Sequence, residues 1–129
     1  MNGRYLLDTN IVIAIFAQDA SVTFQLATAT EVLIPSIVIG ELFYGAYNSK
    51  RIAENVQRIN DFIEANTIIS CDSETAKCYG QIKNTLKTKG RPIPENDIWI
   101  AAIAQQHQLT LVSRDGHLNE VDSIELEVW

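Results

Sequence analysis

Short apolar runs along this chain alternate with longer segments in which apolar residues recur every three or four positions. The short runs are typical of buried strands, and the longer spacing is typical of amphipathic helices. Strands are predicted at residues 5–8, 32–34, 67–70, 109–112 and, as a half-exposed edge, 124–128. Helices are predicted at residues 10–16, 21–28, 36–47, 52–63, 73–90 and 96–107. This alternation predicts an α/β fold in which helices wrap a parallel sheet.

Serine and proline mark several of the predicted helix boundaries. Ser36 and Ser73 each stand at a helix start, where a side-chain oxygen can accept a hydrogen bond from a free backbone N–H. Pro92 and Pro94 break the chain before the very apolar helix that begins at Asn96. We therefore expect both serines to be helix caps and the last helix to be buried against the sheet.

The bulk composition indicates a single domain over residues 1–129. With 47% hydrophobic residues, a chain of 129 residues can form one core without a disulfide or a structural metal. It contains no apolar window of about 18 residues and no separate signal region, so we expect a cytoplasmic protein without a membrane segment. Cys71 and Cys78 match no zinc-binding spacing and are expected to be reduced thiols.

Four acidic residues spread over the chain are the candidate chemistry. Asp8 and Asp115 follow predicted strands, Glu41 lies within a predicted helix, and Asp97 lies in the first turn of another. Ligands of open α/β sheets gather outside the carboxyl ends of the strands. Clustered carboxylates repel one another unless a cation neutralises them, and oxygen-only ligands suit Mg²⁺ or Mn²⁺. The four acids therefore predict a metal-dependent phosphodiester hydrolase.

Each of these acids also has a structural interpretation. Asp8 and Asp115 are suited to capping turns, and Asp97 to a helix start, where the backbone dipole favours a negative charge. Taken singly, each of these three acids is explained better in that way, but chance convergence of all four acids is a much weaker explanation. Glu41 has apolar or small neighbours, and because an unpaired buried charge is costly, its position favours a functional role.

The charge distribution leaves room for a nucleic-acid partner. A net charge of −6 argues against binding to phosphate, although four of the acids belong to the proposed site. A basic strip made of Lys83, Lys87, Lys89 and Arg91 leads directly to the segment that contains Asp97. A solvated helix face explains this strip as well as contact with an RNA backbone does, so both interpretations stay open.

Four motifs, in order along the chain, carry a family resemblance. They are Leu7-Asp8-Thr9-Asn10, Gly40-Glu41-Leu42-Phe43-Tyr44-Gly45, Asn96-Asp97-Ile98-Trp99-Ile100-Ala101-Ala102 and Val112-Ser113-Arg114-Asp115. Each motif alone is weak. Together, and at this chain length, they resemble the PIN-domain ribonucleases, most closely the VapC toxins of bacterial toxin–antitoxin pairs.

The resemblance implies a central parallel sheet with helices on both faces, and an endoribonuclease that depends on Mg²⁺ or Mn²⁺. The catalytic and metal-binding acids that it implies are Asp8, Glu41, Asp97 and Asp115. It also places the polar side chain of Asn10, and the hydroxyls of Thr9 and Ser113, beside the metal. Such toxins typically form homodimers, and a cognate VapB-type antitoxin inhibits them by laying its C-terminal segment over the active-site groove.

The residues themselves favour water as the nucleophile. No serine, cysteine or histidine has an adjacent base that would activate it, whereas a metal can activate water near neutral pH. We expect Asp8 and Asp97 to hold the principal metal, Glu41 to bind it or to orient water, and Asp115 to complete this site or a second one. Products with a 5′-phosphate and a 3′-hydroxyl follow, because the RNA 2′-hydroxyl takes no part. His117 is expected at the surface, at a helix start, rather than against a phosphate.

Three other kinds of protein could place acids in similar positions. A receiver-type signalling domain also binds Mg²⁺, but it needs an acidic pair after the first strand and a late lysine, and Asp8 has no acidic neighbour. A phosphatase of the haloacid dehalogenase type needs a second aspartate where this chain has Asn10, and a longer chain. A catalytically silent PIN module that only binds a partner stays open, although the intact acidic quartet argues against it.

Overall fold

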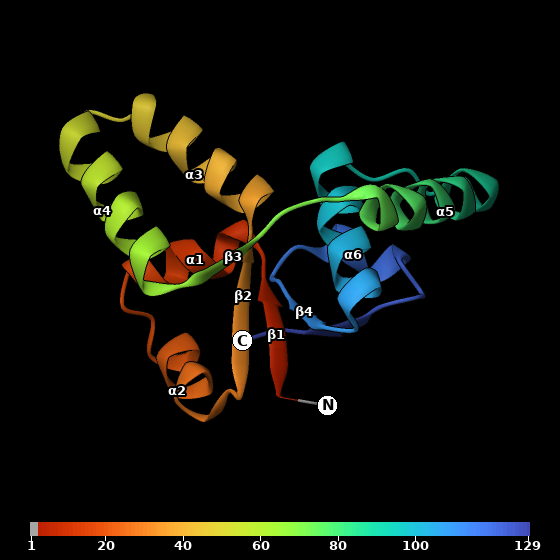
Figure 1. The fold of residues 1–129 in the computed structure, drawn as a ribbon, viewed down its shortest axis with the longest axis horizontal. Coiled ribbons are helices and arrows are strands. Elements are labelled where there is room, and N and C mark those ends of the chain that lie inside the picture. Colours follow the sequence, from red (N-terminus) through yellow and green to blue (C-terminus); the bar gives the residue numbers. More distant parts are fainter. Residues whose placement is uncertain (1–2) are drawn as a thin grey trace.

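The centre of the molecule is a five-stranded parallel sheet with strand order β3-β2-β1-β4-β5 (Figure 1). The computed structural model describes residues 3–129. The strands are β1 (Arg4–Leu7), β2 (Glu31–Pro35), β3 (Thr67–Ile69), β4 (Thr110–Val112) and β5 (Glu125–Glu127). All five predicted strands are confirmed, with bounds that shift by a residue at most.

Within residues 3–129, six α-helices and one short 3₁₀ helix surround this sheet. They are α1 (Thr9–Phe16), α2 (Ala20–Thr28), α3 (Ser36–Tyr47), α4 (Ile52–Ala65), α5 (Ser73–Lys89), α6 (Glu95–His107) and the 3₁₀ helix η1 (Gly116–Glu120). In Figure 1, α1 to α4 gather on one side of β1 and β2, and α5 and α6 lie on the other. The predicted α/β architecture with helices on both faces is therefore confirmed.

The most deeply buried elements are the two central strands and α6. Leu6, Leu7 and Leu111 of β1 and β4 are fully buried, as are Ile100 and Ile103 of α6. A helix that is apolar around its whole circumference must be covered on all sides, and α6 is packed between the sheet, α5 and η1. The predicted burial of this helix is confirmed.

Both serine caps were predicted wrongly. Pro35 occupies the cap position of α3 and provides no side-chain hydrogen bond, so Ser36 is already helical. Asp72, not Ser73, caps α5: its carboxylate accepts from the Thr75 backbone N–H at 3.1 Å, and the Thr75 hydroxyl accepts from the Asp72 N–H at 3.0 Å. Because a carboxylate is the stronger acceptor, the acid one position earlier takes the cap.

Two further expectations concern the cysteines and the membrane. Cys71 and Cys78 are free thiols, as predicted. Among residues 3–129, no single helix is long and apolar enough to cross a bilayer; α1 and α2 reach the required length and composition only together, across a bend of 106°.

Candidate metal centre

Asp8 stands at the carboxyl end of the central strand and is held by three donors. Its backbone N–H extends the sheet by donating to the Val112 carbonyl at 3.0 Å. Its carboxylate, which is buried, accepts from the Thr9 backbone N–H at 2.8 Å, the Ser113 hydroxyl at 2.6 Å and the Asn10 amide at 3.3 Å. These donors fix the orientation of the carboxylate before any ligand binds.

Asn10 and Ser113 also join the segments that follow β1 and β4. The Asn10 side-chain oxygen accepts from the Arg114 backbone N–H at 3.0 Å, and its amide lies 3.4 Å from the Ser113 hydroxyl oxygen. The Ser113 hydroxyl oxygen in turn accepts from the Asp115 backbone N–H at 2.9 Å. Residues separated by more than a hundred positions therefore form one connected network around Asp8.

Asp97 lies in the first turn of α6, where it is buried among the other acids. Burial, the negative charges of Asp115 and Asp8 and, to a smaller extent, the charge of Glu41 together raise its pKa to about 6. His117 acts in the opposite direction. The four acids predicted from sequence therefore converge on one region at the carboxyl edge of the sheet.

Glu41 approaches this region from α3. Its pKa is raised, chiefly by burial and also by the charge of Asp8, while the neighbouring Thr9 hydroxyl counters the rise. That hydroxyl oxygen is buried and makes no hydrogen bond within the usual geometric limits. Next to Glu41 is an open cavity of about 530 Å³ that is also lined by Tyr44 and Asn96. Its volume leaves room for a substrate beside the acids.

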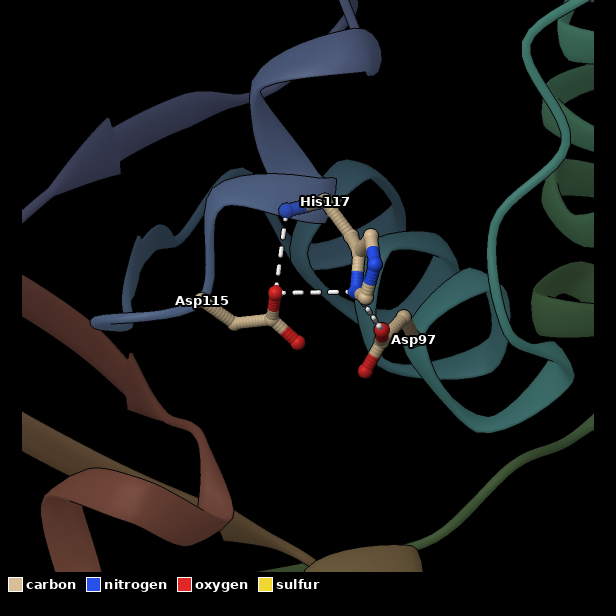
Figure 2. Close-up of side chains that lie close together, drawn as sticks. All are labelled: Asp97, Asp115 and His117. Atoms are coloured by element: carbon tan, nitrogen blue, oxygen red, sulfur yellow. Dashed lines mark hydrogen bonds and ion pairs between the residues drawn. The ribbon is translucent and has the colours of Figure 1, made fainter.

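His117 turns its imidazole ring toward two of the acids (Figure 2). Its Nδ1 lies 2.9 Å from Asp115 Oδ1 and 3.8 Å from Asp97 Oδ2. The His117 backbone N–H also donates to Asp115 Oδ1 at 2.9 Å, and this bond is the main cause of the lowered pKa of Asp115. As predicted, His117 lies at the start of a helix with its side chain 58% exposed.

The direction of that ring is the part of the site that sequence reasoning missed. An aspartate that caps a helix accepts the N–H of the residue two positions later, and this brings that residue close to the carboxylate. Asp115 and His117 have this spacing, and the bond is present. The two-residue spacing of Asp115 and His117 was therefore the sequence feature that could have placed His117 beside this acid.

The donors fit a divalent cation. Single ligand atoms of Asp97, Asp115 and His117 all lie within 4.8 Å of one another. Carboxylate oxygens suit Mg²⁺ and Mn²⁺, and imidazole nitrogen also suits transition metals. A bound cation would remove the repulsion that raises the pKa of Asp97, so the charge of the site and its geometry favour the same ligand.

The basic strip is partly engaged within the protein. Lys83 donates to Glu95 at 2.5 Å, and Lys89 donates to the Glu120 carbonyl at 2.7 Å and lies 3.3 Å from a carboxylate oxygen of Asp122. These acids reduce the positive field of two of the four predicted RNA contacts.

Comparison with known proteins agrees with this geometry. The PIN domain family model matches residues 5–124. The chain is 35% identical to the ribonuclease VapC2 of Haemophilus influenzae, and the match covers 98% of both chains. It is 32% identical to the tRNA(fMet)-specific endonuclease VapC of Shigella flexneri, again over 98% of both.

The chain belongs to the VapC family of PIN-domain ribonucleases. The structure of VapBC2 from Rickettsia felis, bound to a DNA fragment from its promoter, matches with a TM-score of 0.89 at 32% identity and covers 97% of this chain and 98% of that one. VapC membership confirms the resemblance, the fold and the nuclease class that the sequence predicted. Homologues in this family have been crystallised together with their antitoxins.

Proposed function

We propose that this chain is a Mg²⁺- or Mn²⁺-dependent endoribonuclease that acts as the toxin of a VapBC-type pair. The observation that carries the proposal is the environment of Asp97, a buried carboxylate beside three others and without a lysine or arginine partner among the described contacts. Such an arrangement is unfavourable on its own and becomes favourable around a cation. Asp8, Asp97, Glu41 and Asp115 are its proposed ligands.

The residues have separate roles in hydrolysis. A cation held by these acids would supply positive charge that activates water near neutral pH and stabilises the charge developing on the phosphate. Glu41, whose pKa is raised, is suited to orient the attacking water or to accept its proton. Ser113 and Asn10 hold Asp8, and Thr9 adjoins Glu41. The products therefore carry a 5′-phosphate and a 3′-hydroxyl.

The test is cleavage of total cellular RNA by the purified protein with Mn²⁺ or Mg²⁺, beside EDTA and the Asp97→Asn variant. Discrete fragments should form with either metal and be absent from both controls. Mapping of the fragment ends tests the chemistry, and a 2′,3′-cyclic phosphate would contradict it. Folded, antitoxin-free protein that cleaves nothing would favour the silent binding module.

The basic strip is proposed to contact the RNA backbone through its less engaged members. Lys87 and Arg91 are exposed, whereas Lys83 and Lys89 make ion pairs. Changing Lys87 and Arg91 together to alanine should weaken RNA binding and lower the slope of log affinity against log salt by roughly 1 to 2. Metal binding should not change. An unaltered slope would leave the strip as a solvated helix face.

The proposed docking site for an antitoxin segment is an apolar groove between α1, α3 and α4. The groove has a volume of about 190 Å³, is lined by Ile13, Phe16, Leu42 and Ile59, and reaches Glu41 at one edge. Ile13 is 54% exposed, so it presents hydrophobic surface next to the proposed site. A segment that filled this groove would lie against the catalytic acids and could obstruct the RNA.

Co-expression with a VapB-type antitoxin protein tests the docking proposal. The Ile13→Glu variant should lose co-purification with that protein and keep its RNA cleavage. Undiminished co-purification would place the contact elsewhere.

A cytoplasmic homodimer completes the proposal. Tyr44, Tyr47 and Ile52 expose large apolar surfaces around the end of α3 and the start of α4, and surfaces of this kind commonly mark protein contacts. Light scattering should give a dimer for the unmodified chain and a monomer for Tyr47→Glu. A monomer at all concentrations would contradict the homodimer.

A further inference from the structure

His117 brings an imidazole nitrogen into a site otherwise made of carboxylates. The chain has two histidines. The other, His107, is the last residue of α6. Asp97 lies in the first turn of the same helix, so the two residues are about 15 Å apart along the helix axis. The two histidines therefore form a natural pair of test and control positions.

The distances from His117 Nδ1 to the two carboxylates lie within the range found between donor atoms around one cation. With bonds of about 2.1 Å in octahedral geometry, neighbouring ligand atoms are about 3 Å apart and opposite ones about 4 Å apart. His117 Nδ1 lies 2.9 Å from Asp115 Oδ1 and 3.8 Å from Asp97 Oδ2, within this range. Figure 2 shows all three side chains directed toward one another. A hydrogen bond to Asp115 alone would not require the ring to face Asp97.

We propose that His117 Nδ1 is a direct ligand of the divalent cation, beside Asp97 and Asp115, and that it makes the site prefer Mn²⁺ to Mg²⁺. The inference rests on the proposed function, since it requires the site to bind a divalent cation. Mg²⁺ keeps oxygen ligands and gives up its waters reluctantly, whereas transition metals accept imidazole nitrogen more readily. Removing the nitrogen should therefore affect Mn²⁺ more than Mg²⁺.

Metal binding would change the partner of His117 Nδ1 from Asp115 to the cation. Without a bound cation, Nδ1 lies 2.9 Å from Asp115 Oδ1, within hydrogen-bonding distance. To bind the cation, the neutral ring would carry its one proton on Nε2 and offer the Nδ1 lone pair; a proton on Nδ1 would move to Nε2 or, from a doubly protonated ring, to solvent. Asp115 keeps its orientation throughout, because its Oδ1 still accepts from the His117 backbone N–H at 2.9 Å.

Pulsed electron paramagnetic resonance of Mn²⁺ bound to the full chain tests this ligand directly. The spectrum of the unmodified protein should show modulation from a coordinated ¹⁴N nucleus, and ¹⁵N-histidine labelling should shift it. The modulation should disappear in His117→Gln and persist in His107→Gln. Glutamine keeps a polar side chain that can donate to Asp115, so the substitution removes the imidazole with little disturbance of the loop.

Calorimetric titration of the same proteins gives a second readout. The dissociation constant for Mn²⁺ should rise about tenfold in His117→Gln, while that for Mg²⁺ should rise less than about threefold. Stoichiometric Mn²⁺ without ¹⁴N modulation, or equal losses for both ions, would overturn the His117 inference and leave the proposed function intact. No binding of either ion to the unmodified protein would overturn both.

Discussion

Asp72 and Asp97 stand at the starts of neighbouring helices, α5 and α6, in opposite environments. The Asp72 carboxylate accepts from the Thr75 backbone N–H at 3.1 Å and from the Gln106 amide at 2.8 Å, and these hydrogen bonds lower its pKa. Asp97 is buried beside other carboxylates, and its pKa is raised to about 6. Asp72 stabilises the fold, whereas the charge of Asp97 opposes it, and the proposed cation would offset that cost.

The largest expected effect comes from neutralising Asp97. Asp97→Asn should reduce RNA cleavage by at least about a hundredfold, because loss of a metal ligand removes several kcal/mol of transition-state stabilisation. In EDTA the same change should raise the free energy of unfolding by about 1 to 2 kcal/mol, because it removes a buried, repelled charge. Cleavage assays and urea denaturation in EDTA check the two halves. A variant that is both inactive and less stable would make Asp97 a structural residue, like Asp72.

A change at Ser113 tests whether metal binding depends on the hydrogen bonds that orient the Asp8 carboxylate. Ser113→Ala removes the 2.6 Å hydrogen bond to Asp8, and loss of such a bond should weaken metal binding by about 10- to 100-fold. Calorimetric titration with Mn²⁺ measures this change. Ser123→Ala is the matched control, because that hydroxyl donates to Gln105 near the C-terminal end of α6, whereas Asp97 lies in its first turn. Equal affinities for the two variants would mean that Asp8 does not need its donors.

Asp97 also makes both stability and metal binding depend on pH. The raised pKa of Asp97 means that the native state binds more protons than the unfolded state between about pH 4 and pH 6. This residue's contribution to stability is therefore full below that range and is lost as the pH rises through it. Metal binding must displace the same proton, so Mn²⁺ affinity should fall about tenfold from pH 7 to pH 5. Flat affinity over this range would show that Asp97 is already ionised there.

The smallest effect on catalysis is expected from a change at Thr75, which bonds Asp72 at the start of α5. Thr75→Val removes a buried hydroxyl that accepts from the Asp72 backbone N–H and bonds the Gln106 side chain. Such a loss should lower the free energy of unfolding by about 1 to 3 kcal/mol. RNA cleavage below the melting range should stay within about twofold of the unmodified protein. A large loss of cleavage would show that the hydrogen bonds of Thr75 affect the proposed catalytic acids.

The fold was predictable because the apolar periods of strands and helices are local properties of the chain. The four acids could be grouped because the parallel sheet places the ends of β1 and β4 at one edge. The cap at Ser73 was not predictable in the same way, because the neighbouring Asp72 competes for the same N–H group. At Ser36 the error was one of position, because the cap residue is Pro35 and Ser36 is already helical. Lys83 and Lys89 pair with acids 12 and 33 positions away, and such contacts depend on how α5 packs rather than on sequence spacing.

The bond between Asp8 and Ser113 has a consequence for when this protein can act. The two residues are 105 positions apart, and β1 can pair with β4 only after the segment between them has been made. A parallel pairing of such long sequence separation also forms slowly. A ribosome that has not yet translated β4 therefore carries a nascent chain in which the acidic site is not assembled.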